Sequence, residues 1–187
     1  MNSIYVIKKV MELSELQSAF QNGFIDLFDE CFNTAPYFLK YSDEELFNIY
    51  EDHFKTGFVL FAYLDGEMVG FAGSRPLLED EYVADDIKAF LDNPEDYYYH
   101  SDLGVSRAQR GKGLARTLIA ETIAHTPVGK IIMRTKEDNA PSIDLHIKMG
   151  FVPIEAAQTI KGVNSLGDEI ADKRIYLVFN KEAKKDV

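Results

Sequence analysis

The amino-acid sequence predicts an α/β fold built around a mixed sheet flanked by helices. Strand-like and helix-like segments alternate along its 187 residues. Asp65 and Gly66 separate two strand-like runs, and this pair supplies the positive φ angles that a tight hairpin turn needs. A glycine-rich turn at residues 110–115 then joins an apolar, strand-like run to a helix-like one. This order of elements indicates a sheet that contains both antiparallel and parallel neighbours.

The expected helices begin and end at recognisable residues. Residues 14–31 carry apolar side chains at roughly helical spacing. Ser42 and Glu45 form a capping box, which opens a second helix that ends near Gly57. Gly150 is the glycine expected just after the last turn of a helix. The sequence therefore predicts helices at residues 14–31, 42–57, 114–124 and 139–150.

The expected strands are apolar runs or runs with apolar residues at every second position. Ile175, Leu177 and Phe179 recur in this way, as in a strand with one buried face. The sequence predicts strands at residues 4–10, 58–64, 67–73, 97–105, 131–135 and 174–180. An acidic insertion at residues 79–96 precedes the strand at 97–105, and its apolar residues predict a short amphipathic helix.

The composition predicts a single domain over residues 1–187, with a frayed tail at about 181–187. Hydrophobic residues make up 46% of the chain and charged residues 27%, as is ordinary for a globular protein. The lone Cys31 excludes a disulfide framework, and we find neither a signal-peptide core nor a membrane-spanning run. We therefore expect a cytoplasmic protein without a membrane partner. The net charge of −11 argues against a nucleic-acid partner, because a phosphate backbone would be repelled.

The turn at residues 110–115 is the most informative candidate for a binding site. Gly111 and Gly113 let backbone N–H groups approach an anion without interference from a Cβ atom. The helix behind them adds unpaired donors and the positive end of its dipole. A glycine-rich turn can also simply end a strand, but four basic residues surround this one and favour a bound polyphosphate: Arg107, Arg110, Lys112 and Arg116.

Two other phosphate-binding templates do not fit this turn. A P-loop requires Lys and then Ser or Thr after its last glycine, whereas Leu114 follows Gly113. A dinucleotide-binding fingerprint requires a small residue where Arg116 stands. The turn alone therefore identifies an anion site but not its ligand.

A second landmark lies downstream at residues 139–151. Together the two landmarks resemble the signature of the GCN5-related N-acetyltransferase (GNAT) family. The acetyl-CoA loop of that family is matched by Arg110, Gly113 and Ala115. The second landmark is matched by Asn139, Ser142, Leu145, Gly150 and Phe151, while His146 stands where the family usually has tyrosine. The resemblance is firm over residues 58–151 and loose outside them.

The resemblance implies a mixed, mostly antiparallel twisted sheet flanked by helices, with acetyl-CoA as cosubstrate and no metal. It implies direct transfer of the acetyl group to a primary amine, without a covalent acyl-enzyme. Backbone N–H groups at Leu103, Gly104 and Val105 would polarise the thioester carbonyl. The remaining residues expected to contact acetyl-CoA are Arg110, Gly111, Lys112, Gly113, Leu114, Ala115, Arg116, Asn139 and Ser142.

His146 and Tyr99 are the candidate catalytic residues. His146 shares one face of its helix with Asn139 and Ser142, and it therefore points inward. It is either a core histidine satisfied by a hydrogen bond or, by the resemblance, the donor to the departing thiolate of coenzyme A. Such donation depends on the pKa of His146, because a neutral imidazole is a poorer proton source than its cation.

The base that deprotonates the amine is not singled out by the sequence. Tyr99, His100, Ser101 and Asp102 all lie on the strand that leads into the expected site. Strand alternation places Tyr99 and Ser101 on the same face as Leu103. Any of the four candidates could act directly or through a water molecule, and each could equally be an ordinary strand side chain.

The acceptor is expected to be a small cationic amine rather than a protein. The acidic insertion could form a funnel for such an amine, or it could be a solvated face. By analogy with the family, Phe32, Tyr37 and Tyr41 would provide apolar walls for the acceptor. The alternatives are a protein amine, another acyl group, or a sensor module that binds acetyl-CoA with little turnover. Either a monomer or a homodimer is compatible with the sequence.

Overall fold

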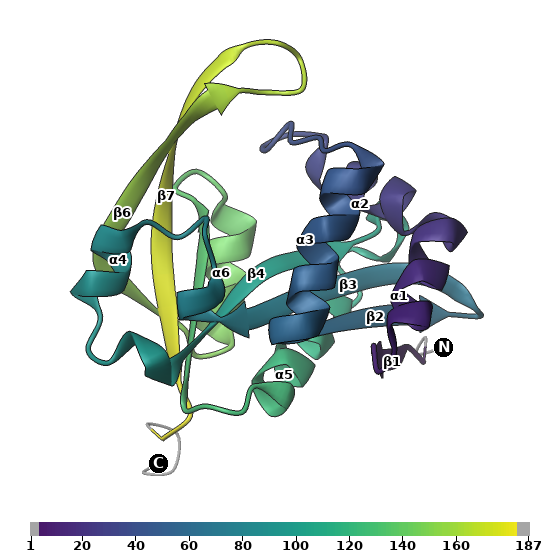
Figure 1. Ribbon diagram of the computed structural model, residues 1–187, viewed down its shortest axis with the longest axis horizontal. Coiled ribbons are helices and arrows are strands. Elements are labelled where there is room, and N and C mark those ends of the chain that lie inside the picture. Colours follow the sequence, from purple (N-terminus) through teal and green to yellow (C-terminus); the bar gives the residue numbers. More distant parts are fainter. Residues whose placement is uncertain (1–3, 183–187) are drawn as a thin grey trace.

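The computed structural model describes residues 4–182 of the chain, and residues 183–187 of the expected tail lie outside this range. At its centre is a seven-stranded sheet in the order β1-β2-β3-β4-β5-β7-β6, with helices on both faces (Figure 1). The strands are β1 (Val6–Lys9), β2 (Phe58–Leu64), β3 (Glu67–Pro76), β4 (Tyr97–Val105), β5 (Lys130–Lys136), β6 (Val152–Val163) and β7 (Glu169–Asn180). The α-helices are α1 (Leu13–Ala19), α2 (Ile25–Phe32), α3 (Asp43–Thr56), α4 (Asp85–Phe90), α5 (Leu114–His125) and α6 (Ala140–Lys148).

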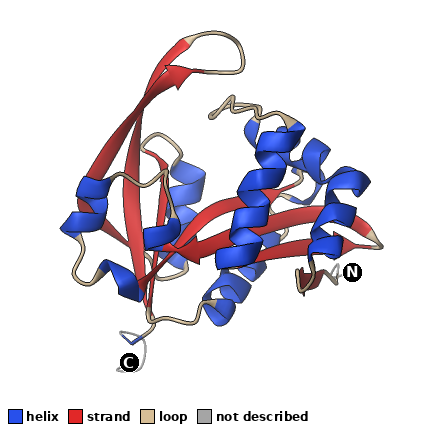
Figure 2. Cartoon of the chain, in the orientation of Figure 1, coloured by secondary structure: helices blue, strands red, loops and turns tan. Residues whose placement is uncertain are grey.

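Most neighbouring strands in the sheet are antiparallel. Among the strands of the described residues, only β4 and β5 run parallel, and α5 connects them (Figure 2). The β2–β3 hairpin turns at Asp65 and Gly66, whose φ angles of 52° and 89° are those expected for this pair. The predicted fold class, a mixed and mostly antiparallel sheet flanked by helices, is confirmed.

Alternation along β2 divides the core between the two faces of the sheet. Val59 and Phe61 pack into a cluster with buried residues of α1, α2 and α3. Leu60 and Ala62 point the other way and pack in a cluster with Leu118 of α5. The sheet therefore has a core on each face, one beneath α1, α2 and α3 and the other beneath α5.

The first helical region differs from the single helix predicted at residues 14–31. Asn22 and Gly23 leave the helical conformation, with φ/ψ of −119°/42° and 101°/4°, and they separate α1 from α2. Asn-Gly is a common turn signal, and glycine adopts a positive φ without steric cost. The next predicted helix is confirmed, because Ser42 and Glu45 cap α3 reciprocally.

The β6–β7 hairpin is longer than the sequence indicated. The prediction placed only residues 174–180 in a strand, whereas β7 begins at Glu169, and β6 was not predicted at all. Strand β6 lies at the edge of the sheet, and no residue in it is fully buried. Its weak apolar pattern follows from this exposure, since an edge strand need not bury a continuous face.

The acidic insertion is anchored by a buried ion pair. Arg75 Nη2 lies 2.7 Å from Asp80 Oδ2, and both side chains are almost fully buried. The other carboxylate oxygen of Asp80 accepts from the backbone N–H groups of Tyr82 and Val83. The insertion then forms α4, which buries Ile87, so that the predicted amphipathic helix is confirmed.

Candidate active site

The sheet opens where β4 and β5 stop pairing. Their parallel ladder joins residues 97–100 to residues 130–133, while β4 continues to Val105 and β5 to Lys136. Beyond the ladder, this edge of β4 has no strand partner among the described residues. Ser106 N–H donates to the Val69 carbonyl of β3, so alternation directs the N–H of Gly104 to β3 and those of Leu103 and Val105 to the unpaired edge.

A bulge in β4 changes which side chains share a face. Gly73 of β3 pairs with Asp102 and Ser74 pairs with His100, so that one extra residue, Ser101, is inserted. Ser101 and Asp102 both line a cavity on the α3 side of the sheet, together with Tyr99. Leu103 packs in the cluster of α5 on the opposite face. The expectation that Leu103 shares a face with Tyr99 and Ser101 is therefore wrong, because strict alternation fails at a bulge.

The predicted phosphate turn has the geometry of an anion cradle. Gly111 and Gly113 have φ angles of 74° and 92°, and a Cβ at either position would meet no atom within 4 Å. Helix α5 begins directly after Gly113 and has no acidic residue in its first turn. Leu114 is buried and Ala115 is half-buried, so only their backbones can contribute to the cradle. Four exposed basic side chains form no salt bridge with a described residue: Arg107, Arg110, Lys112 and Arg116.

The second landmark begins helix α6 on the far side of the opening. The Oδ1 atom of Asn139 accepts from the backbone N–H of Ser142 at 3.4 Å, which caps the helix. The Nδ2 group of Asn139 donates to the hydroxyl of Tyr37 at 2.9 Å. Tyr37 also lies 3.0 Å from the hydroxyl of Thr135 on β5. The connection between α2 and α3 is thereby fixed against β5 and α6, at the edge of the cavity.

His146 is buried on the inner face of α6, with 1% of its surface exposed. Its Nδ1 lies 2.8 Å from the carbonyl oxygen of Ser142, which can only accept, so the ring proton is on Nδ1. Its Nε2 is buried and has no hydrogen-bond partner among the described residues. Burial lowers the pKa of His146 and favours the neutral ring. A neutral His146 thus presents a lone pair at Nε2, and only its cation could donate a proton there.

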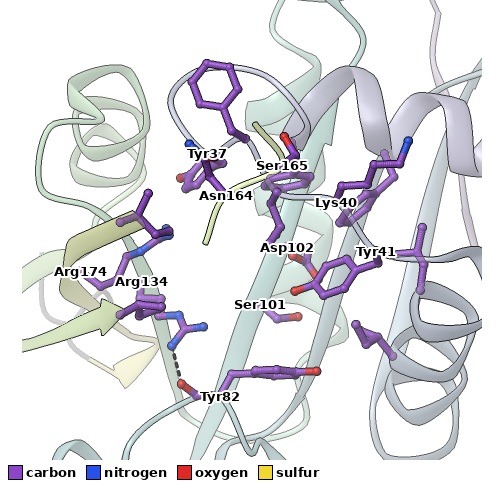
Figure 3. Close-up of a pocket in the computed structure, with 18 of the residues that line it drawn as sticks. Tyr37, Lys40, Tyr41, Tyr82, Ser101, Asp102, Arg134, Asn164, Ser165 and Arg174 are labelled. Atoms are coloured by element: carbon purple, nitrogen blue, oxygen red, sulfur yellow. Dashed lines mark hydrogen bonds between the residues drawn. The ribbon is translucent and has the colours of Figure 1, made fainter. Parts of the chain in front are cut away.

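A cavity of about 410 Å³ lies between β4, the α2–α3 connection and the β6–β7 hairpin. Figure 3 shows Arg134 and Arg174 on one side of it and Ser101, Asp102 and Tyr41 on the other. Aromatic side chains form much of its wall: Phe28, Phe32, Tyr37, Tyr41, Tyr82 and Tyr99. The hairpin closes over the connection at one point, where the Ser165 N–H donates to the Phe38 carbonyl at 2.7 Å. The predicted wall residues Phe32, Tyr37 and Tyr41 therefore do lie together.

The four base candidates on β4 have different surroundings. Tyr99 is 2% exposed, and burial raises its pKa far above the ordinary value, so that its phenol stays neutral. His100 points to the opposite face of the sheet, where its ring lies 5.9 Å from that of His146. Burial raises the pKa of Asp102, while the charge of nearby His53 partly offsets this effect. Asp102 is the carboxyl group among the four candidates, and it lines the cavity, as a proton acceptor for an amine held there must.

His53 of α3 is linked to the cavity through Ser101. Its Nδ1 donates to the Ile49 carbonyl at 2.6 Å, and its Nε2 forms a short hydrogen bond with Ser101 Oγ. Ser101 Oγ also lies 3.1 Å from the Gly73 carbonyl. Burial lowers the pKa of His53, and the charge of Asp102 opposes that shift. The contacts hold the bulged segment of β4 against α3.

Three cavity residues were assigned no role from the sequence: His53, Arg134 and Arg174. His53 lies in a helix predicted from its cap alone. Arg134 follows three buried apolar residues of β5, and a charged residue inside such a strand indicates a functional position. Arg174 was placed in a strand, but its neighbours in the cavity come from distant segments. Their convergence depends on tertiary structure.

Comparisons with known proteins were made for the whole chain. The model of the "Acetyltransferase (GNAT) family" matches residues 19–151. Among solved structures, the ribosomal-protein-S18-alanine N-acetyltransferase from Escherichia coli is 14% identical, with a TM-score of 0.65 over 95% of this chain and 94% of that one. An N-acetyltransferase from Staphylococcus aureus Mu50 is 16% identical, with a TM-score of 0.67 over 96% and 99%. The structure of yncA from Salmonella typhimurium with its cofactor acetyl-CoA is 18% identical, with a TM-score of 0.64 over 96% and 95%. No curated protein matches the chain.

Two findings concern residues 4–182. None of the helices there combines the length and the apolar character needed to cross a membrane. No three His, Cys, Asp or Glu side chains in that part of the chain are gathered as a metal site would require.

Proposed function

The chain belongs to the GNAT acetyltransferase family, and from this premise we propose that it moves the acetyl group of acetyl-CoA directly onto the amine of a small molecule held in the cavity. One observation carries the proposal. The β4 bulge places the Asp102 carboxylate in the cavity, immediately before the backbone edge at residues 103–105 that β5 leaves unpaired. A proton acceptor thus lies next to the backbone N–H groups of Leu103 and Val105.

Acetyl-CoA binding is supported by the turn before α5. The positive φ angles of Gly111 and Gly113 expose their backbones, and the adjoining basic side chains form no salt bridge with a described residue. These features suit the pyrophosphate of coenzyme A. We assign Asn139 and Ser142 to the pantetheine side of the same substrate, since they start the helix that carries His146.

The proposed reaction begins when Asp102 accepts a proton from the ammonium group of the acceptor. The free amine then attacks the thioester carbonyl carbon and the C–N bond forms. The nitrogen releases its second proton to solvent, and the C–S bond breaks. Backbone N–H groups of Leu103 and Val105 stabilise negative charge on the carbonyl oxygen. The thiolate leaves on the α6 side, where His146 is the predicted donor, provided that its ring is protonated.

A small-molecule acceptor is favoured by the shape of the cavity. The contact between Ser165 and Phe38 closes part of its rim, which leaves less room for a folded protein. The expected acidic funnel has little support from the cavity wall. Of the acidic residues in the insertion, only Asp80 lines the cavity, and Arg75 neutralises it. We therefore propose an amine acceptor that is not selected by positive charge alone.

Acceptor-dependent release of coenzyme A thiol tests this function. The purified chain is incubated with acetyl-CoA and a panel of primary amines, and thiol release is compared with that in the absence of amine. Acetylated product, identified by mass, would support the proposal. Tight acetyl-CoA binding without product for any amine would instead support the sensor module. Propionyl-CoA and succinyl-CoA in place of acetyl-CoA would show whether another acyl group is preferred.

A further inference from the structure

Arg134 lines the cavity with a positive charge that no carboxylate of the described residues contacts directly. Its Nη1 donates to the Tyr82 carbonyl through a short hydrogen bond and to Gln158 Oε1 at 3.2 Å. Its guanidinium lies 5.9 Å from the centre of the Tyr99 ring. All these partners are neutral, and Arg134 forms no salt bridge with any acidic residue in the described range. A largely buried guanidinium without an anion is unusual, because desolvating a charge is costly.

Arg174 adds to the positive charge on the same side of the cavity. Asp172 is 3.2 Å from Arg174 Nη2, but it is also 3.0 Å from Lys136 Nζ, so one carboxylate serves two cations. The Nε of Arg174 is buried and has no hydrogen-bond partner among the described residues. This group of three charges therefore carries a net charge of about +1. Together with Arg134, it makes one side of the cavity a site for an anion.

Asp102 provides the opposite charge across the cavity. It forms no salt bridge with a residue of the described chain, and Arg134 acts on it only at longer range. Figure 3 shows the space between Asp102 and the two arginines. Two unpaired charges of opposite sign on facing walls are complementary to a molecule that carries both an ammonium and an anionic group. The geometry points to a zwitterionic acceptor.

We propose that the acceptor is a free amino acid with an apolar side chain. Its ammonium group would lie at Asp102, and its carboxylate would lie at Arg134 and Arg174. Planar guanidinium groups bind carboxylates through paired hydrogen bonds. The aromatic wall that includes Phe28, Phe32 and Tyr41 would contact the side chain. This inference rests on the proposed function and names the substrate class of that site.

Matched acceptors test the inference. Acetyl-CoA turnover is measured with phenylalanine, with phenethylamine, which lacks the carboxylate, and with phenylalaninamide, in which the carboxylate is neutralised. Leucine and isoamylamine form a second pair. We expect kcat/KM to be roughly 100-fold higher for each amino acid than for its partner without a carboxylate, as for loss of a buried charge pair. Equal or faster turnover of the simple amines would overturn the inference and leave the proposed function intact. Failure of every amine would overturn both.

Variants locate the carboxylate site. Arg134→Gln should lower kcat/KM for phenylalanine roughly 100-fold but change it less than about threefold for phenethylamine. Arg174→Gln should likewise lower kcat/KM for phenylalanine but not for phenethylamine. It tests the carboxylate site independently if Arg134→Gln does not fold. Lys173→Gln is the control, since Lys173 is exposed and pairs with Glu137 at 2.5 Å, outside the cavity lining. Equal losses for both acceptors in the two arginine variants would contradict a carboxylate site.

Discussion

The imidazole rings of His100 and His146 lie 5.9 Å apart, centroid to centroid, between strand β4 and helix α6. Both side chains are buried, and the Nε2 atom of each has no hydrogen-bond partner among the described residues. Burial lowers the pKa of both rings, and proximity to His146 lowers that of His100 further, to about 3. The protein therefore holds two neutral histidines side by side on the face where the thiol would leave.

This pair should make the fold sensitive to mild acid. An unfolded histidine takes up a proton below a pH of about 6.5, whereas folded His100 does not until pH is far lower. The unfolded state then binds more protons, so stability falls as pH drops from about 6.5 towards 5, by up to ~1.4 kcal/mol per pH unit for each histidine. His100→Asn should reduce this slope by up to ~1.4 kcal/mol per pH unit, the contribution of one bound proton. Urea unfolding at several pH values measures it.

The control for the acid experiment is His125→Asn, because His125 lies on α5 and is partly exposed. Comparing the two variants separates the loss of a buried histidine from the loss of a histidine on the surface. Identical slopes in the wild type and in His100→Asn would show that His100 does not remain neutral in the folded protein.

The tautomer of His146 also predicts how turnover should depend on pH. Because Nδ1 donates to Ser142, only the His146 cation can donate from Nε2 to a thiolate. If it does, kcat must fall as pH rises through its pKa, which burial lowers. His146→Phe should reduce kcat roughly tenfold near pH 6 and abolish this decline. His146→Tyr, with the hydroxyl usual in the family, should retain turnover near pH 6 and at higher pH. A Phe variant as active as wild type would remove His146 from the mechanism.

Local signals in the sequence were enough for much of the fold. The Asp65-Gly66 turn, the Ser42 cap and the strand at residues 97–105 are confirmed, because each depends on residues that are close in sequence. Strand β6 was missed because an edge strand without a buried residue leaves little apolar pattern. The single helix predicted at residues 14–31 is wrong at Gly23, where the Asn-Gly pair forms a turn.

The site also has a part that local sequence predicts and a part that depends on tertiary structure. The phosphate turn is one contiguous stretch, so its glycines and basic residues could be read together. The cavity instead brings His53, Arg134 and Arg174 together from three separate elements. Its arrangement on β4 depends on a bulge at Ser101, which arises from pairing with β3 and has no marker in β4 alone. Sequence patterns therefore could not predict that Asp102 faces Arg134 and Arg174 across the cavity.

Gly113 provides a test of the phosphate turn that separates binding from backbone strain. Its φ of 92° is nearly that of Gly66, 89°, and a Cβ at either position would meet nothing within 4 Å. Gly113→Leu and Gly66→Leu should each lose roughly 1–2 kcal/mol of stability from the positive φ. Only Gly113→Leu should weaken acetyl-CoA binding, by at least about tenfold in calorimetry, because its side chain would occupy the phosphate site. Unchanged binding would contradict the cofactor assignment.

Asp102 is the residue on which acceptor activation depends. Asp102→Asn keeps the side-chain shape but cannot accept a proton, so kcat/KM for the acceptor should fall roughly 100- to 1,000-fold while KM for acetyl-CoA stays unchanged. In the wild type, kcat/KM should rise with pH through the pKa of Asp102, which burial raises, and this ascending limb should disappear in the variant. Asp92→Asn, at an exposed position in the acidic insertion, should behave as wild type. An Asn variant within threefold of wild type, with the limb intact, would assign the base to another group, because a carboxylate that is not the proton acceptor has no reason to set this limb.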